Sequence, residues 1–380
     1  MDMNTYRAKE SVISKILPTM TKGLFSLLLI GNILSAHSSS DSVMPAPLLH
    51  LDDYFSHHVI VAEKSTHKLY VFKNKEGIPN LVKTYQIATG KKAGDKIFQG
   101  DHRTPEGVYY LTDFLTHQEL LNRHGKQGEI YGVGAFVLNY PNPIDDQEGK
   151  TGGGIWLHST NDETRIEKGL DSRGCIVAAN SDLIDISQYI ELHKTPIVVT
   201  HELLFLSNAR WVMKRNKVKD ALEGWINAWR EEDINKYISH YHASFKDPNK
   251  GNVSQFKNYK RAVFAGPGKP EIEITDLSII QSGDYIRATF KQKYSSNTIT
   301  DMGRKTLYLK QDGYYNWKIV AEKWSKNGVT SETTLEQPEQ PKMASFVPSL
   351  RFFETTNPKA ILGDRLLSKQ TSSVQEESNN

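Results

Sequence analysis

Residues 152–159 read GGGIWLHS, and residues 171–177 read DSRGCIV. The second stretch contains Cys175, the only cysteine of the 380-residue chain, and the first contains His158 at the end of a predicted strand. A cysteine attacks a carbonyl group as the thiolate, so it needs a base or a positive field. We therefore expect Cys175 to pair with His158, with Arg173 favouring the thiolate and Gly174 freeing the backbone to face an oxyanion. Since the chain has 13 histidines, spacing alone leaves other pairings open.

The N-terminus predicts export. Basic residues up to Lys22 precede an apolar run at 23–34, and the small residues Ser35 and Ala36 follow it. This order is typical of a secretory signal, which we place at residues 1–36. The alternative is a membrane anchor, but the run is shorter than the ~20 residues of a spanning helix. We expect a protein of the periplasm or cell envelope, where a lone cysteine cannot form an internal disulfide. Without its context, that cysteine would be interpreted as an inert buried side chain.

Composition excludes some partners. The formal net charge is only +3, and the chain has no dense Lys/Arg tract, so we expect no nucleic-acid partner. His57 and His58 are adjacent but lack neighbours with metal-ligand spacing, so we predict no metal and no cofactor.

The length favours two domains, because a typical domain has about 100–200 residues. An N-terminal arm at 37–57 precedes a mostly β domain at 58–202. Its strands are predicted from alternating or short apolar runs at 59–62, 68–72, 81–88, 107–111, 135–138, 155–158 and 196–200. One helix is expected from Asp182 to about Leu192, capped by Ser181.

After a linker at 203–216, the pattern changes. Apolar residues at helical spacing between Val218 and Tyr241 predict helices. Strands are predicted at 271–280, 284–294, 304–309 and 314–324, which makes 217–325 an α+β domain. The tail at 326–380 is rich in polar residues and is predicted to be largely disordered, with a docking patch at 346–353.

The two opening stretches resemble the active-site signature of the L,D-transpeptidase catalytic (YkuD-type) family, in which a His precedes a loop and Ser/Thr-x-Gly-Cys. Thr104-Pro105-Glu106-Gly107 is similar to the family's Thr-Pro-x-Gly turn, and Ala88-Thr89-Gly90 also fits. The resemblance covers about residues 59–200 and implies a β-sandwich or barrel. It implies that a peptidoglycan stem peptide acylates Cys175, with His158 as general base. It also implies that the Ser159 carbonyl orients the imidazole, and that the Cys175 and Gly174 amides bind the oxyanion.

Three further residues are candidates for substrate binding. Ser172 is expected to brace the loop, either as a plain turn residue or with a part in the site. Arg173 stands where many members of the family have His; it can hold a substrate carboxylate or form a structural ion pair. Tyr131 lies in a Gly-flanked loop that can form part of a lid.

The second domain resembles the nuclear transport factor 2-like fold, and its aromatic residues around Trp225 and Trp229 are expected in the core. The combination is similar to L,D-carboxypeptidases that trim stem tetrapeptides to tripeptides. The same acyl-enzyme can instead form 3–3 crosslinks or attach or release a lipoprotein. A non-catalytic wall-binding scaffold is the alternative outside enzymes. A homodimer or a wall-protein partner would use the C-terminal domain or the tail.

Overall fold

The computed structural model describes residues 42–266, 268–297, 299–326 and 351–363. The predicted signal peptide at 1–36 lies outside these residues. Within them, no helix combines the length and apolar character needed to cross a membrane.

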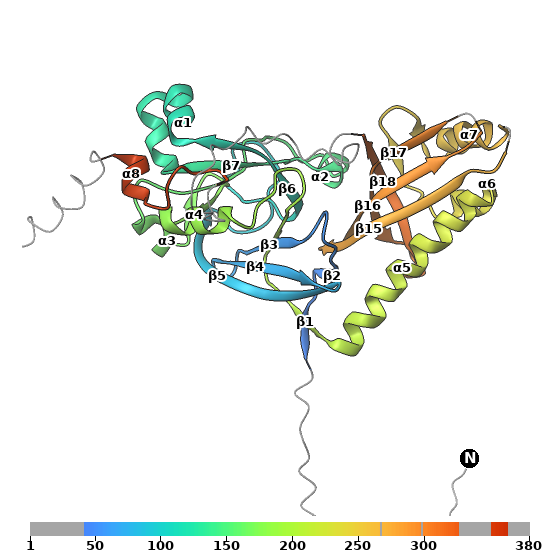
Figure 1. Ribbon diagram of the computed structural model, residues 1–380, viewed down its shortest axis with the longest axis horizontal. Coiled ribbons are helices and arrows are strands. Elements are labelled where there is room, and N and C mark those ends of the chain that lie inside the picture. The colour runs from blue at the N-terminus through green and yellow to red at the C-terminus, as the bar shows by residue number, and fades with distance from the viewer. Residues whose placement is uncertain (1–41, 267, 298, 327–350, 364–380) are drawn as a thin grey trace, which may run out of the picture. The chain divides into compact units, whose positions relative to one another are not determined.

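The first domain is a closed β-barrel (Figure 1). Its strand order is β10-β8-β7-β6-β11-β3-β4-β5, and antiparallel pairing of β10 with β5 closes the ring. A short strand, β9, extends the sheet beside β5. The strand bounds are β3 His58–Glu63, β4 Lys68–Lys75, β5 Ile78–Gly90, β6 Gly107–Thr116, β7 Gly134–Leu138, β8 Trp156–His158, β9 Leu170–Ser172, β10 Ile176–Ala178 and β11 Pro196–Thr200. The structure thus confirms the predicted mostly β domain and adds β9 and β10, which flank Cys175.

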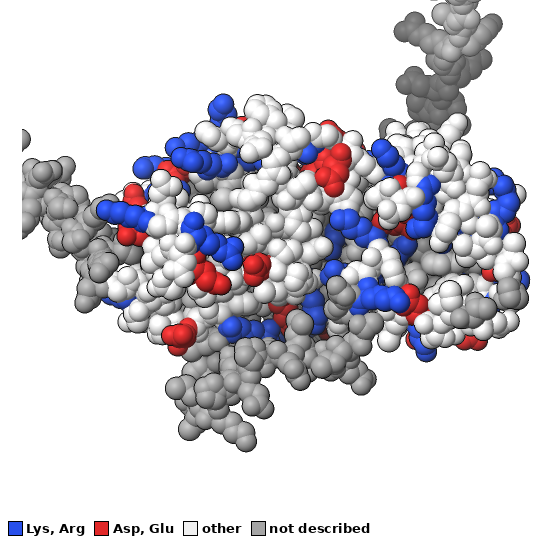
Figure 2. Space-filling model, turned by 90° about the horizontal axis from the view of Figure 1, so that it is seen from above, with Lys and Arg blue, Asp and Glu red and all other residues white. Residues whose placement is uncertain are grey.

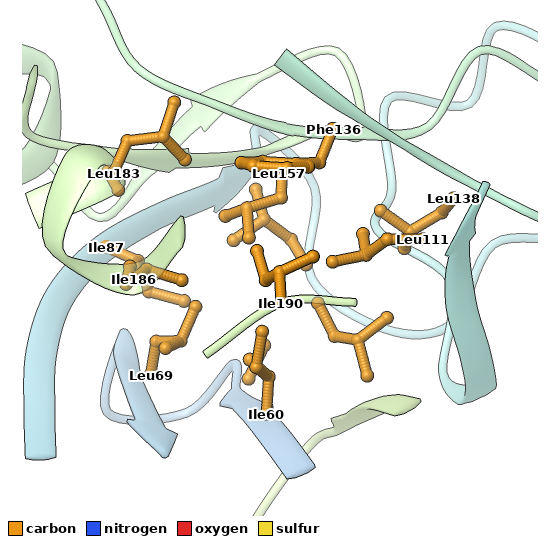
Figure 3. Close-up of a cluster of buried hydrophobic side chains, with 14 of the residues drawn as sticks. Ile60, Leu69, Ile87, Leu111, Phe136, Leu138, Leu157, Leu183, Ile186 and Ile190 are labelled. Atoms are coloured by element: carbon orange, nitrogen blue, oxygen red, sulfur yellow. The ribbon is translucent and has the colours of Figure 1, made fainter. Parts of the chain in front are cut away.

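Alternating side chains of these strands fill the barrel (Figure 3). Ile60, Leu69 and Ile87 come from β3, β4 and β5, and none of them is exposed. Leu157 of β8 joins the same cluster, immediately before His158. The core therefore holds rigidly the strand that ends at the predicted base.

Short helices connect the strands. They are α1 His117–His124, η1 Gly125–Tyr131, α2 Pro143–Gln147, α3 Thr164–Glu167 and α4 Asn180–Ser187. The helix predicted from Asp182 exists as α4, but it begins at Asn180, and its N-cap is Ala179, which makes no side-chain cap. The prediction of Ser181 as the cap was wrong because the chain enters the helix two residues earlier.

The second domain is α+β, as predicted. Its sheet has the order β18-β17-β16-β15-β2, and α5 packs against it (Figure 1). The bounds are α5 Asn208–Arg230, α6 Ile234–Ser239, β13 Lys246–Asp247, β14 Gly251–Asn252, α7 Val253–Phe264, β15 Glu271–Ser282, β16 Tyr285–Ser295, β17 Thr300–Gln311 and β18 Trp317–Ser325. Trp225 and Trp229 lie in its hydrophobic core. On the face shown in Figure 2, basic and acidic side chains are interspersed, in line with the small net charge.

The parts outside the two domains are more structured than expected. The arm forms β1 Val43–Pro45, which pairs with β12 Phe205–Ser207, and β2 Leu48–His50, which joins β15. Because β12 and the first turns of α5 occupy 205–216, the predicted linker is largely regular structure. Within the tail, residues 351–363 include α8 Pro358–Leu362, whereas 327–350 and 364–380 lie outside the described residues.

Candidate active site

Two parallel strands bring the predicted nucleophile and base together. β8 ends at His158, and β10 begins directly after Cys175. Leu157 lies opposite Ile176 and His158 opposite Val177. One step back, this register places Cys175 beside Trp156, about 7 Å along the strand from His158 and on the same face. Both side chains line one cleft of about 1170 Å³.

His158 is held in one orientation. Its side chain is only 2% exposed, and Nδ1 lies 2.5 Å from the carbonyl oxygen of Ser159. Since a carbonyl can only accept, Nδ1 carries the proton and Nε2 has the free lone pair. The Tyr131 ring packs edge-on against the imidazole at 5.0 Å. Burial lowers the pKa of His158 to about 4, despite the Ser159 carbonyl bond. The imidazole is therefore neutral at pH 7 and able to accept a proton at Nε2.

Cys175 is half-buried and protonated at neutral pH. Its Sγ donates a hydrogen bond to the carbonyl of Gly154 at 3.6 Å. Burial raises the pKa of Cys175 to about 11, although a backbone hydrogen bond from Trp156 and the charges of Arg165 and Lys96 act to lower it. Arg173, which the sequence predicts to favour the thiolate, is not among these groups. The resting pair is a neutral thiol beside a neutral imidazole.

The turn before Cys175 closes on Ser172. The Ser172 hydroxyl donates to the Cys175 carbonyl at 2.6 Å and accepts the Gly174 N–H at 3.0 Å. The structure thus contains the bracing contacts expected of Ser172. Of the two amides expected to bind the oxyanion, the Gly174 N–H is bonded to Ser172 in this structure. The Cys175 N–H is left as the candidate donor from this pair.

The backbone conformation and close packing at position 174 require glycine. Its φ is 127°, and a Cβ there would lie 2.8 Å from the Arg103 carbonyl oxygen. Arg103 leads into the Thr-Pro-Glu-Gly turn, where Thr104 Oγ1 accepts the Gly90 N–H at 2.9 Å. The buried Lys64 donates to the Thr104 carbonyl at 2.8 Å. The Thr-Pro-Glu-Gly turn and Arg103 therefore pack against the loop that carries Cys175.

The remaining predicted residues also line the cleft. Arg173 is exposed there, and no ion pair between described residues includes it, which favours substrate carboxylate binding over a structural ion pair. Tyr131 ends η1 and packs on Trp156 at 4.9 Å between ring centroids. The catalytic and binding roles of all these residues stay predictions.

Several cleft residues gave no sequence signal. Arg165 forms an ion pair with Asp171 across the cleft wall. The buried Asn180 donates to the Thr160 carbonyl at 2.8 Å and accepts the Val133 N–H at 3.2 Å, which ties the segment after Ser159 to α4. Their partners lie on the short strand β9 and in loops, whose positions no local pattern specifies.

A second polar cluster lies inside the C-terminal domain, where sequence reasoning found no coherent set. Lys305 Nζ lies 2.9 Å from Glu322, and both side chains are 7% exposed. Tyr241 donates to Glu322 at 3.0 Å. Lys260 Nζ lies 4.4 Å above the Trp229 ring, and burial lowers the pKa of Lys260 to about 8. Among the described residues of the whole chain, no group of three or more His, Cys, Asp or Glu is arranged to hold a metal.

The fold and the site define a barrel domain whose cleft holds a cysteine and a histidine, followed by an α+β domain. Residues 57–199 match the L,D-transpeptidase catalytic domain family (YkuD), and residues 217–323 match the Cds6 C-terminal NTF2-like domain family. Among solved structures, Bd1075 of Bdellovibrio bacteriovorus is 31% identical with a TM-score of 0.66, over 75% of this chain and 99% of that one. The helical cell shape determining protein Pgp2 of Campylobacter jejuni is 27% identical with a TM-score of 0.59, over 75% and 97%.

No curated protein matches the chain. The two domain matches give the family of the chain, and the similarity to Bd1075 extends over nearly all of that protein. The chain belongs to the L,D-transpeptidase catalytic domain family and has a C-terminal NTF2-like domain.

Proposed function

We propose that this protein is an exported L,D-carboxypeptidase that trims peptidoglycan stem tetrapeptides to tripeptides through an acyl-enzyme on Cys175. The observation that supports it best is the fixed tautomer of His158, which leaves Nε2 free to accept a proton in a residue that lines the same cleft as Cys175. A base with its proton on the far nitrogen is what a neutral thiol needs.

The chemistry follows from the neutral pair. When a stem peptide binds, the Cys175 proton moves to Nε2 of His158 while Sγ bonds to the carbonyl carbon before the terminal D-alanine. The oxygen of that carbonyl becomes an oxyanion, stabilised by the Cys175 N–H. Collapse of this intermediate breaks the C–N bond, and the imidazolium returns its proton to the leaving amine of D-alanine. Water, activated by the same imidazole, then cleaves the thioester and releases the tripeptide carboxylate and the free thiol.

Hydrolysis rather than crosslinking is favoured by similarity of architecture, which is an argument by analogy. Pgp2, which shares both domains, is a helical cell shape determining protein. Crosslinking to the amine of a second stem and attachment of a lipoprotein need a bulky amine acceptor instead of water, whereas release of a lipoprotein is itself a hydrolysis. We place the protein in the periplasm or cell envelope, and a homodimer or wall-protein partner would use the C-terminal domain or tail.

The test incubates the purified protein with a disaccharide tetrapeptide and follows the products by mass spectrometry. We expect loss of one alanine without dimers. Crosslinked dimers would show transpeptidation, and an unchanged substrate would indicate a wall-binding scaffold. Cys175→Ala should abolish turnover, and His158→Ala should lower kcat by about a hundredfold or more. His201→Ala, an exposed histidine outside the cleft, is the matched control.

A further inference from the structure

Residues 351–363, the C-terminal segment, are anchored in the catalytic domain. Phe353 is only 5% exposed and belongs to the barrel's hydrophobic cluster. Its ring centroid lies 5.1 Å from that of Phe114, and Phe352 lies 5.0 Å from Phe136. Phe136 is on β7, the neighbour of the strand that ends in the candidate base. Paired aromatic rings of this kind hold a segment firmly in place.

The anchored phenylalanines place α8 at the edge of the cleft. The Asn357 side chain caps the helix by accepting the Lys359 N–H at 3.1 Å, and Gly363 ends it with a φ of 69°. α8 contacts α4, beside which it is drawn in red in Figure 1. The residues of this segment that line the cleft with Cys175 and His158 are Asn357, Pro358, Lys359, Leu362 and Gly363.

The acidic side chains of the cleft are already engaged. Asp171 pairs with Arg165, and Asp162 accepts the N–H and hydroxyl of a residue in α3. Glu163 accepts the Asn180 N–H at 2.9 Å. These contacts occupy oxygens of all three carboxylates, and the charge of Asp171 is paired with a cation.

Three basic side chains of the cleft are not engaged in this way. Lys91, Arg173 and Lys359 line the same cleft and are exposed, and the ion pairs among the described residues include none of them. The cleft therefore offers three cationic side chains without an ion-pair partner among the described residues, one on each of three separate segments. A ligand that carries carboxylates would complement them.

We propose that the C-terminal segment is a wall of the substrate cleft and that Lys359 binds a carboxylate of the stem peptide away from the scissile bond. This inference rests on the proposed function, because it takes a stem peptide as the ligand. The C-terminal segment would then contribute to substrate selection. Acidic stems would be preferred over stems whose carboxyl groups are amidated.

The test compares two disaccharide tetrapeptides, one with free carboxylates inside the stem and one with the same groups amidated. For Lys359→Ala we expect KM for the acidic substrate to rise by about tenfold with kcat within about twofold, since one charge-assisted contact made equally in the ground and transition states is lost. KM for the amidated substrate should not change. Lys246→Ala, an exposed lysine of the second domain, is the matched control.

Calorimetric binding of both peptides to the Cys175→Ala protein separates this inference from the proposed reaction. If the acidic peptide binds Cys175→Ala more tightly than the Cys175→Ala/Lys359→Ala double variant, but the unaltered protein does not turn it over, the proposed reaction is refuted and the role of Lys359 in the cleft wall is supported. Turnover with equal KM values for the Lys359→Ala and unaltered proteins on both substrates would overturn the wall and leave the reaction standing. Melting temperatures of the Lys359→Ala, Lys246→Ala and unaltered proteins should agree, because both lysines are exposed.

Discussion

The neutral resting state of Cys175 makes a prediction about its reactivity. Burial raises the pKa of this thiol from 9.0 to about 11. At pH 7, the thiolate fraction then falls from about 1 in 100 to about 1 in 10,000. A thiolate of higher pKa is intrinsically more nucleophilic, which restores roughly tenfold of this loss. We therefore expect iodoacetamide to alkylate the folded protein about tenfold more slowly than the unfolded chain at pH 7.

The assay follows alkylation by mass spectrometry between pH 6 and pH 10. Since the chain has a single cysteine, the same thiol in urea-unfolded protein is an internal reference. The folded rate should still rise at pH 10. His158→Ala should change this profile little, because the imidazole is neutral and no ion pair exists to be broken. A plateau below pH 8 that disappears in His158→Ala would refute the reasoning, since it would reveal a preformed thiolate–imidazolium pair.

Gly174→Ala should lower the melting temperature by several degrees and abolish activity, because φ is 127° and a Cβ would press on a backbone carbonyl at 2.8 Å. Gly153→Ala, with open space around its Cβ position, is the control. Phe353→Ala should destabilise the protein by about 3–5 kcal/mol in urea unfolding, whereas Phe98→Ala, on an exposed side chain, should stay within about 0.5 kcal/mol. The pKa of His158 is about 4 when folded and 6.5 when unfolded, so its contribution to stability is complete above pH 6.5 and lost as pH falls towards 4. Replacing it with Gln should flatten the fall in melting temperature over that range.

The strands of both domains were predictable because they are either alternating apolar and polar sequences or short apolar runs. β11 matches its predicted bounds of 196–200, and β4 and β15 begin at the predicted residues 68 and 271. The pairing of Cys175 with His158 was predictable for a different reason. The family signature specifies it, whereas spacing alone left the other histidines open.

What the sequence could not predict depends on contacts between distant segments. β10 is three residues long and exists because it closes the barrel against β5, so no local pattern marks it. The hydrogen bond from the Gly174 N–H to Ser172 is a detail of turn geometry that the signature does not contain. Phe352 and Phe353 belong to the docking patch predicted at 346–353, but the sequence did not indicate that they would pack on the barrel. Composition predicts that such a tail cannot fold alone, which does not exclude docking on a domain that is already folded.

A high thiol pKa is consistent with the proposed location. A lone cysteine in an oxidising compartment has no partner to form a disulfide, and its thiolate is the form that oxidants attack. A protonated, half-buried sulfur such as Cys175 is protected between turnovers. The cost is a weak nucleophile, which a correctly oriented neutral base offsets only when a carbonyl carbon lies within reach. The Ser159 carbonyl that fixes His158 therefore has a double effect: it prepares Nε2 for the proton, and it allows the sulfur to stay uncharged until substrate arrives.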